Sequence, residues 1–534
     1  MPSKKFTITI DNILGGRSAL GNFGKEGQFR NSLAIDPDAS ETSSSARASG
    51  YLVPVPATAL TNAIGSGIDD ELLWMNLNPK DDDAYGYDRS GKVYRIRTGT
   101  YAISYLNNGT ALTASTGNGA SYYDNFQYFA KNTDICRYGR LDGARTYNQT
   151  YWTSTLSLTD LGNGVTYPAL KIGTTRYPNH PMHVHVDDKL YIGDVAAAGS
   201  PNGKGLIHFI KTKRVTTEGD TNDGSTYNAL DLGLGIWPIA IESYGTDLAI
   251  SGYEGNTDSG NTRGKRAKIY FWDTTSASFN KEVELPDPLC SALKNVNGVL
   301  YAFCGNPGDV GVRILRFVGG YSFEEVAYLE DSQPPFQGAV DHLLNRVLFG
   351  GFSSSMGDYG CLYAIGSKIG RITTGVFNIM RTTTPNSTGV TVTSVLVPEN
   401  TDLTNPTYYI AWRDGGGTSE FGIDRNATTY GQSRFQSEVF RLGKRFRIDE
   451  ISIPTAQAIA ANMTIAVAVV VDNGSTSTTV ATINNTTYSG SQRQVVLRPS
   501  VIGNHDFYLD LTWSGSSLVT VGLPITIKGE YIEL

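Results

Sequence analysis

The sequence contains few of the residues that build metal, redox or disulfide sites. Its 534 residues include only four cysteines and six histidines. The cysteines, Cys136, Cys290, Cys304 and Cys361, are widely spaced and form no CxxC pair, so neither a zinc site nor a dense disulfide framework is indicated. We expect free, buried thiols in strands, although Cys290 and Cys304 could close a short loop.

Long apolar runs are also missing. The longest, Ile465 to Val471, is far shorter than the roughly 20 residues that span a bilayer, so membrane insertion is not expected. Residues Met1 to Lys5 are basic, as at the start of a signal peptide. Residues Phe6 to Ile10 alternate apolar and polar side chains instead of forming an apolar core of about 7–15 residues. We therefore interpret the start of the chain as a strand.

Charge is sparse, and basic residues are not in excess. Asp, Glu, Lys and Arg make up 18% of the chain, and the formal net charge is -7. Nucleic-acid binding needs clustered Lys and Arg that displace counterions. The densest basic run, Lys444, Arg445 and Arg447, alternates with Phe446 and Ile448, as on the solvated face of a strand. No nucleic-acid partner is expected.

The chain is instead rich in residues that favour strands and tight turns. It contains 59 glycines and 30 tyrosines, and Thr, Ser and Asn are frequent. This composition favours an all-β protein. A chain of this length should form two to four domains, or one large repeat domain with an appendix.

A weak repeat occupies the middle of the chain. In each unit a polar turn is followed by a short apolar strand that ends in Gly, and a second strand follows. The terminal glycines are 59, 53 and 45 residues apart. The four clearest units are Val184–Gly193, Glu242–Gly252, Lys294–Gly305 and Asp341–Gly350.

Repeats of roughly 40–60 residues with several short strands and no helix are typical of propeller blades. We predict an irregular β-propeller of about six blades over residues 50–376, with five or seven blades still open. Residues Gly50 to Pro54 could supply the strand that closes the ring. The alternative is a row of hairpins folded as two stacked sandwiches.

The two ends differ from the repeat. Residues 1–49 hold too few apolar side chains for a core of their own, and we interpret them as an extended N-terminal arm that orders against another subunit. The alternative is a flexible tail. Residues 377–534 contain seven or eight alternating strands, which predict a jelly-roll-like β-sandwich. Residues Pro454 to Met463 could form one or two helical turns at a corner.

Two segments resemble known proteins. The runs Thr7 to Gly16, Gly24 to Phe29 and Ile35 to Asp38 are similar to the N-terminal arm of uncharacterised tailed-bacteriophage virion proteins in which a propeller follows. The stretch Glu438 to Pro454 resembles sandwich domains of virion and carbohydrate-binding proteins. The resemblance implies a tail, connector or baseplate component, assembled in the host cytoplasm and located in the virion. It transfers no functional residues.

Histidines provide the first candidate metal site. His180, His183 and His185 form a cluster, and the last two point to the same face of a strand, as two zinc ligands could. No third ligand is identifiable, so we interpret them as ordinary strand residues and predict no metal or other cofactor.

Acidic residues provide the other candidates. Asp81 to Asp83 and Asp220 to Gly224 could offer oxygens to calcium, but neither matches an EF-hand loop, and solvated turns are the preferred interpretation. A glycosidase would need converging carboxylates. Many aspartates are available for that role, so no catalytic residue is assigned. They include Asp142, Asp187, Asp188, Asp247 and Asp341.

Three functions remain. The leading prediction is a non-enzymatic structural virion protein that forms a symmetric homo-oligomer and binds other tail proteins. The second is a glycan-binding adhesin, in which Tyr122, Tyr123 or Trp412 could stack on sugars of the host surface. The third is a propeller-fold enzyme that degrades polysaccharide.

Overall fold

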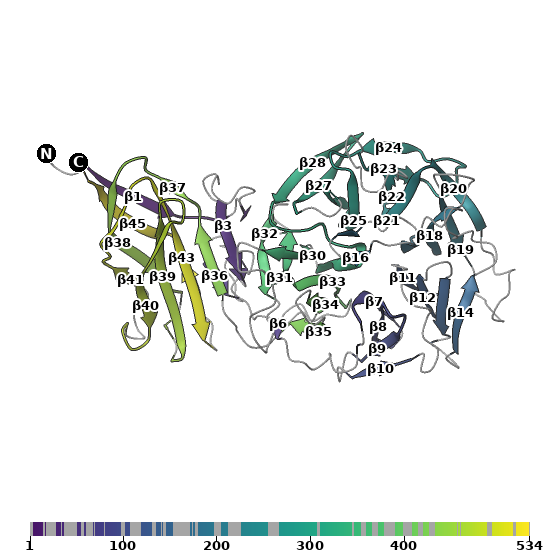
Figure 1. The fold of residues 1–534 in the computed structure, drawn as a ribbon, viewed down its shortest axis with the longest axis horizontal. Coiled ribbons are helices and arrows are strands. Elements are labelled where there is room, and N and C mark those ends of the chain that lie inside the picture. The colour runs from purple at the N-terminus through teal and green to yellow at the C-terminus, as the bar shows by residue number, and fades with distance from the viewer. Residues whose placement is uncertain are drawn as a thin grey trace. The chain divides into compact units, whose positions relative to one another are not determined.

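The structure of the protein is a computed structural model (Figure 1). Asp142, the run Asp220 to Gly224 and the run Ser40 to Ser49 lie outside the residues that it describes. The described residues are 4–13, 16–17, 28–33, 35–36, 51–54, 58–59, 68, 70–79, 81–97, 102–106, 119–130, 135–139, 141, 146–152, 171–172, 175–176, 180–196, 204–211, 226–254, 266–306, 310–343, 346–353, 359–365, 372–378, 390–398, 408–414, 420–426, 433–456, 458–459, 461–488, 494–515 and 519–532.

The prediction of an all-β protein is confirmed. Within the described residues the only helical element is one 3-10 turn, Gln337–Ala339, and the described part of 454–463 contains no helix. None of the described segments is a helix of the length and apolarity needed to cross a membrane. The chain divides into a sandwich unit (1–60, 361–385 and 425–534) and a ring unit (61–360 and 386–424).

The ring unit is built from small antiparallel sheets, which we number as blades 1 to 7 in chain order. Blades 1 to 5 each have four strands that lie in chain order, and blades 6 and 7 contribute their first strands to this unit. The strands are β7 (Leu72–Leu77), β8 (Ala84–Asp88), β9 (Val93–Ile96) and β10 (Ile103–Tyr105) in blade 1; β11 (Ala120–Tyr123), β12 (Phe126–Ala130), β13 (Ile135–Gly139) and β14 (Thr146–Trp152) in blade 2; β17 (Met182–His185), β18 (Lys189–Ala196), β19 (Lys204–Ile210) and β20 (Thr226–Leu234) in blade 3; β21 (Ile236–Tyr244), β22 (Asp247–Glu254), β23 (Lys268–Trp272) and β24 (Lys281–Glu284) in blade 4; β25 (Leu289–Val296), β26 (Val299–Gly305), β27 (Val312–Gly319) and β28 (Ser322–Leu329) in blade 5; β29 (Val340–Leu343) and β30 (Arg346–Ser353) in blade 6; and β33 (Val390–Leu396), β34 (Tyr409–Asp414) and β35 (Glu420–Asn426) in blade 7.

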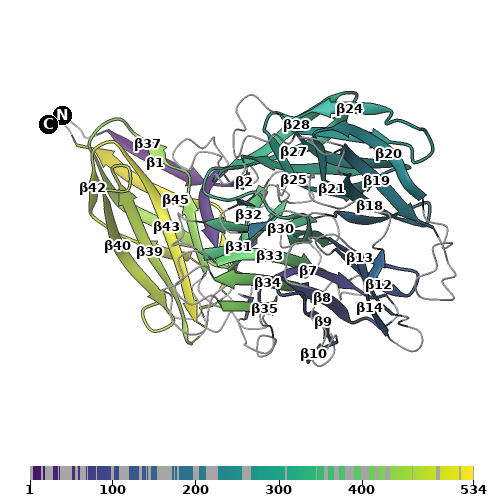
Figure 2. The same cartoon turned by 45° about the vertical axis from the view of Figure 1, so that its right-hand side comes forward.

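The first strands of the blades form a closed circle. Each contacts the next in the order β7, β11, β17, β21, β25, β29 and β33, and β33 returns to contact β7. Figures 1 and 2 show the sheets arranged around this circle. A β-propeller is therefore confirmed, and two stacked sandwiches are excluded for the ring unit. The described strands give seven blades rather than about six.

The additional blade lies beyond the predicted end of the propeller. Blade 7 uses residues 390–426, which the sequence analysis placed in the sandwich because their Thr- and Val-rich strands match that region in composition. The predicted closing strand also differs. Strand β5 (Tyr51–Pro54) pairs with β4 (Ile35–Asp36) and β44 (Val521–Gly522), whereas the end of β35 pairs with β6 (Thr58–Ala59).

Apolar side chains fill the space between neighbouring blades. Trp74 of blade 1 shares one cluster with Phe129 of blade 2. On the other face of blade 1, Tyr94 shares a cluster with Tyr409 and Ile423 of blade 7. Burying a large apolar side chain stabilises a fold by about 1.5–3 kcal/mol, so these layers supply the force that closes the ring.

The glycine that ends each sequence repeat lies in the second strand of its blade. A Cβ atom at Gly193 would lie 2.7 Å from Pro181 Cγ and 3.0 Å from Pro238 at the start of the next blade. A Cβ atom at Gly350 would overlap Val392 of blade 7. At these two positions the backbone approaches the next blade too closely for a side chain, which explains the glycine.

The sandwich unit contains two sheets whose inner faces share one hydrophobic core. Trp513 from one sheet and Ile527 from the other are both fully buried in it. Strand β3 (Gln28–Leu33) lies beside β36 of the second sheet. The first sheet has the order β1 (Lys5–Ile10), β45 (Ile525–Tyr531), β38 (Phe446–Pro454) and β41 (Gln494–Leu497), and the second has β36 (Ser433–Ser437), β43 (Asp506–Gly515), β39 (Met463–Val471) and β40 (Thr476–Asn484).

The described parts of the N-terminal segment belong to this unit and do not form an arm. Strand β1 pairs with β45 along its whole length, and Ile10 and Phe29 are buried in the shared core. The prediction that residues 1–49 order against another subunit is wrong for these strands. The segment has too few apolar residues for a core of its own, but its apolar side chains pack into the core formed by the C-terminal strands.

The alternating face of β38 is confirmed. Phe446 and Ile448 are buried, whereas Arg447 lies on the outer face and pairs with Asp449 and Glu530.

Strand β1 can be tested by an inward and an outward substitution. Ile10 is 6% exposed, whereas the neighbouring Thr9 is exposed. We expect Ile10→Ala to lower the free energy of unfolding of the sandwich unit by about 2–4 kcal/mol, because it leaves a cavity in the core. Thr9→Ala should change it by less than about 0.5 kcal/mol. Urea unfolding followed by Trp fluorescence measures both, and equal effects would contradict the placement of β1.

Candidate functional site

Titratable side chains gather on the first strands of four consecutive blades. They are His183 of β17, Glu242 of β21, Lys294 of β25 and Asp341 of β29. Each lies 9 to 11 residues before the repeat glycine of its own blade, so the four occupy equivalent positions in the repeat. We call these four residues the inner-strand belt.

An ion pair joins blades 5 and 6 within the belt. The Lys294 Nζ atom lies 3.0 Å from Asp341 Oδ1, and both side chains are largely buried. The other oxygen of Asp341 accepts a hydrogen bond of 2.8 Å from the backbone N–H of Val397, which follows β33 of blade 7. One carboxylate therefore links three blades.

A hydrogen-bonded chain joins blades 3 and 4. The Nε2 atom of His185 lies 3.0 Å from the carbonyl oxygen of Thr246, which can only accept, so Nε2 carries the proton. In a neutral ring Nδ1 of His185 then accepts from the Ser243 hydroxyl at 2.8 Å. The Ser243 Oγ atom in turn accepts from Nε2 of His183 at 2.7 Å. In this arrangement Nε2 is the donor nitrogen of both imidazoles.

Burial controls the protonation of the belt. It raises the pKa of Glu242 to about 7, and the nearby Lys294 ammonium only partly opposes this rise. It lowers the pKa of His183 to about 3, and Lys294 again contributes by repulsion. Burial disfavours the Asp341 carboxylate, but the Lys294 ammonium and the hydrogen bonds from His342 and the Val397 N–H together outweigh that effect and hold the pKa at about 2. Two carboxyl groups in one belt therefore differ in protonation near neutral pH.

This difference defines what the belt could do chemically. A carboxyl group that is protonated below pH 7 can donate a proton or a hydrogen bond, and a neutral imidazole lies near it, with His183 Nε2 4.0 Å from Glu242 Oε1. Clusters of perturbed pKa values are typical of functional sites, although structural networks produce them too. Every charged group of the belt interacts with a group on an adjacent blade, which favours a structural role.

The structure separates the three histidines of the predicted cluster. His183 and His185 face the same way, as predicted, and share Ser243. His180 is buried elsewhere, 3.9 Å from Asp194, which also lies 3.2 Å from His208. Among the described residues no group of three or more His, Cys, Asp or Glu side chains could hold a metal ion.

Several of the candidate aspartates have local partners. Asp187 pairs with Lys189 at 2.7 Å and accepts from Tyr191. Asp81 and Asp83 pair with Arg95, and both are at least partly buried, so their interpretation as solvated turn residues is wrong. Of the described candidates, the structure places Asp341 in the belt.

Sequence reasoning missed Glu242 and Lys294. Both are the first residue of a recognised repeat unit, and Asp341 is the first residue of another. Three units that begin with Glu, Lys and Asp show charge of alternating sign at one repeat position. That alternation could have predicted ion pairing between neighbouring blades.

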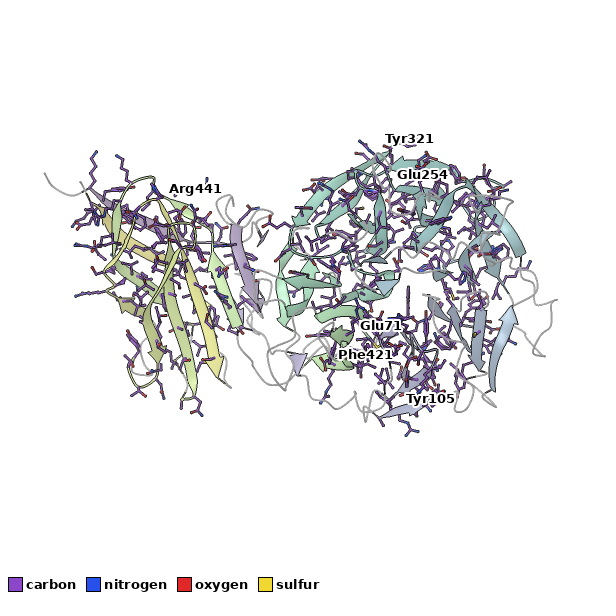
Figure 3. All side chains as sticks on the ribbon, viewed as in Figure 1. Glu71, Tyr105, Glu254, Tyr321, Phe421 and Arg441 are labelled. Atoms are coloured by element: carbon purple, nitrogen blue, oxygen red, sulfur yellow. The ribbon has the colours of Figure 1, made fainter. Side chains whose placement is uncertain are left out.

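The aromatic residues proposed for sugar binding are mostly in the core. Tyr123 is 3% exposed and Trp412 8% exposed, so neither offers a free ring face, and Tyr122 packs against the cluster between blades 1 and 2. Tyr321 is 73% exposed instead and lies at the outer rim of the ring (Figure 3). The Lys281 Nζ atom lies 4.9 Å from the centre of its ring.

The protonation of Glu242 predicts a pH-dependent stability. Because its folded pKa of about 7 exceeds the ordinary value of 4.5, its favourable contribution is complete below pH 4.5 and is lost as the pH rises through 7. We expect wild type to lose about 3 kcal/mol relative to Glu242→Gln between pH 4.5 and pH 8. Calorimetry of both proteins at pH 4.5, 6 and 8 measures this difference, since the other groups titrate in both. A difference that stays constant with pH would refute the assignment.

The ion pair of the belt predicts a strong loss when one partner is removed. We expect Lys294→Met to lower the free energy of unfolding of the ring unit by about 3 kcal/mol, because it leaves the Asp341 carboxylate buried without its cation. The double variant Lys294→Met with Asp341→Asn should recover part of that loss.

A surface pair in blade 4 provides the matched control. Lys268 pairs with Glu282 across β23 and β24 where both side chains are about a third exposed. Lys268→Met should lower the free energy of unfolding by less than about 1 kcal/mol. Urea titrations of the two single variants measure both values. Equal costs at positions 294 and 268 would show that the belt does not hold the blades together.

Comparison with known proteins gives matches among solved structures alone. No protein family model and no curated protein match the chain. Among solved structures, the Cps50 (Swd1) β-propeller domain of Myceliophteria thermophila is similar at 10% identity and a TM-score of 0.40, over 68% of this chain and 98% of that one. The Pan2 WD40 domain of Neurospora crassa is similar at 5% identity and 0.39, over 67% and 90%. A protein from Lactobacillus plantarum is similar at 14% identity and 0.39, over 56% and 82%. Similarities of this degree say nothing about what the chain binds.

Proposed function

We propose that the protein is a non-enzymatic structural component of a tailed-phage virion. In this proposal the protein is assembled in the host cytoplasm. It forms a symmetric homo-oligomer and binds other tail proteins through the surfaces of its two β-units. The single observation that carries the proposal is the strand order of the sandwich unit.

We assign a jelly-roll order to eight strands of the sandwich unit, leaving out β3 at the β36 edge of the second sheet. Numbered along the chain they are β1, β36, β38, β39, β40, β41, β43 and β45. One sheet then has the order 1-8-3-6 and the other 2-7-4-5. Jelly rolls of two such sheets occur in viral capsid proteins and lectins. The order therefore supports a virion role, together with the resemblance of residues 7–16 to virion proteins.

The connectivity of the chain supports a rigid building block. All seven propeller blades lie in sequence between the first and second strands of the jelly roll. The inner-strand belt also supports a rigid building block, because its charged side chains connect neighbouring blades. The described strands β1 and β3 are occupied within the sandwich unit, so assembly is proposed through outer surfaces rather than through an arm.

The proposal predicts assembly. We expect the purified full-length chain, mixed with the neighbouring tail proteins of its phage, to sediment as a defined oligomer, and we expect its peptides to be detected by mass spectrometry in washed virions. The unmixed chain is the control for self-association. A chain that stays monomeric with those proteins and is absent from virions would contradict the proposal.

A glycan-binding adhesin is the second candidate, and one observation favours it. Lectins share the jelly-roll order, and Tyr321 offers an exposed ring at the rim of the propeller. Binding to host-surface glycans that is lost in Tyr321→Ala but kept in Tyr123→Phe would support it.

A polysaccharide-degrading enzyme is the third candidate and depends on Glu242. Its protonated carboxyl group could act as a general acid. Depolymerisation of a surface glycan by the wild type but not by Glu242→Gln would support it.

A further inference from the structure

Two cysteines face each other across the first hairpin of blade 5. Cys290 on β25 is the register partner of Cys304 on β26. Both thiols are free, and both residues are fully buried. They belong to the hydrophobic cluster that also contains Ala249 and Ile269 of blade 4. The two side chains therefore project from the same face of the sheet into one layer between blades.

The geometry of facing residues in an antiparallel pair suits a disulfide. Their Cα atoms lie about 4.5 or 5.5 Å apart, depending on the hydrogen-bond pattern. Both values fall within the range of about 4.4–6.8 Å found across disulfides. Facing Cβ atoms lie about 4.5–5.5 Å apart and must approach to about 3.5–4.5 Å. The register shifts between Cys290 and Ala292, and such a bulge allows the local adjustment that this approach needs.

We propose that Cys290 and Cys304 are a redox pair that forms a reversible cross-strand disulfide by thiol–disulfide exchange with a small-molecule disulfide. One cysteine thiolate attacks the small disulfide, which gives a mixed disulfide and releases one small thiol. The second cysteine thiolate then attacks the protein sulfur and releases the second small thiol. The two cysteine protons pass to the two released thiolates. The small disulfide is reduced, and the cysteine pair is oxidised.

Burial makes this pair slow to react in the folded ring. It raises the pKa of the Cys304 thiol, so the reactive thiolate is scarce in the native state. Exchange therefore proceeds through opening of the hairpin or during folding, and the product bond is then shielded from reductant. The bond joins the innermost strand of blade 5 to the next strand.

The chain contains a matched control cysteine. Cys136 is also buried, but its register partner is Phe129 on β12. It lies in the same kind of layer, between blades 1 and 2, without a facing thiol. Oxidation that depends on facing geometry should therefore spare Cys136.

The experiment measures the disulfide equilibrium in the folded and unfolded chain. The full-length variant Cys136→Ser with Cys361→Ser keeps only the proposed pair. It is equilibrated at pH 8 in mixtures of oxidised and reduced glutathione, without urea and in 8 M urea, each approached from the reduced and the oxidised side. Rapid alkylation and mass spectrometry of the 290–304 segment give the fraction of disulfide. The controls are the same variant with Cys290→Ser, and the chain that keeps Cys136 with Cys290→Ser and Cys304→Ser.

We expect the equilibrium constant for the disulfide to be at least about tenfold higher in the folded chain than in urea. By linkage, a tenfold difference should then raise the thermal midpoint of the variant by roughly 2 °C on oxidation. The Cys290→Ser control should show no shift with redox state, and Cys136 should stay free. An equilibrium constant in the folded chain equal to or below that in urea would overturn the proposal, as would a fall in the thermal midpoint on oxidation.

Discussion

The contact between blade 7 and blade 1 is the constraint on which the ring unit depends. A four-stranded sheet is too small to bury both of its faces alone, so each blade needs a neighbour on either side. Among the described residues, apolar clusters fill five of the spaces between blades. The cluster of Tyr94 with Tyr409 and Ile423 is the one that turns a row of sheets into a ring. Without it two blade faces would remain exposed to water.

Polar groups near the ends of the first strands add specificity to that apolar packing. In the inner-strand belt the ion pair between Lys294 and Asp341 and the chain from His183 through Ser243 bridge consecutive blades. Buried charges stabilise little on balance, because their desolvation offsets their attraction. They do penalise a wrong order or register of blades, in which a charge would be left without its partner. Apolar layers thus supply the stability, and the belt favours one arrangement.

The sequence predicted the features that repeat locally. The apolar strands that end the predicted units Val184–Gly193 and Lys294–Gly305 correspond to β18 and β26. Gly193 and Gly350 marked their repeat units because the next blade leaves no room for a side chain at either position. The strands within 433–531 lie in the region 377–534 for which alternating strands were predicted.

The features that the sequence did not reveal depend on distant contacts. The strands of blade 7 have the same composition as those of the sandwich, so nothing local assigns residues 390–426 to the ring. Strand β1 completes a sheet more than 500 residues away, where it pairs with β45. Glu242 and Lys294 are ordinary strand residues until ring closure brings neighbouring blades together.

Native-state hydrogen exchange of the full-length chain tests the closed seven-bladed ring most directly. If blade 7 completes the propeller, the amides of β33 and β34 should open with the same free energy as those of β7 and β8. A destabilising substitution at Ile423 should lower the protection of both blades together. The account would be contradicted if the amides of β33 and β34 opened with the free energy of the sandwich core and the substitution left the protection of β7 unchanged.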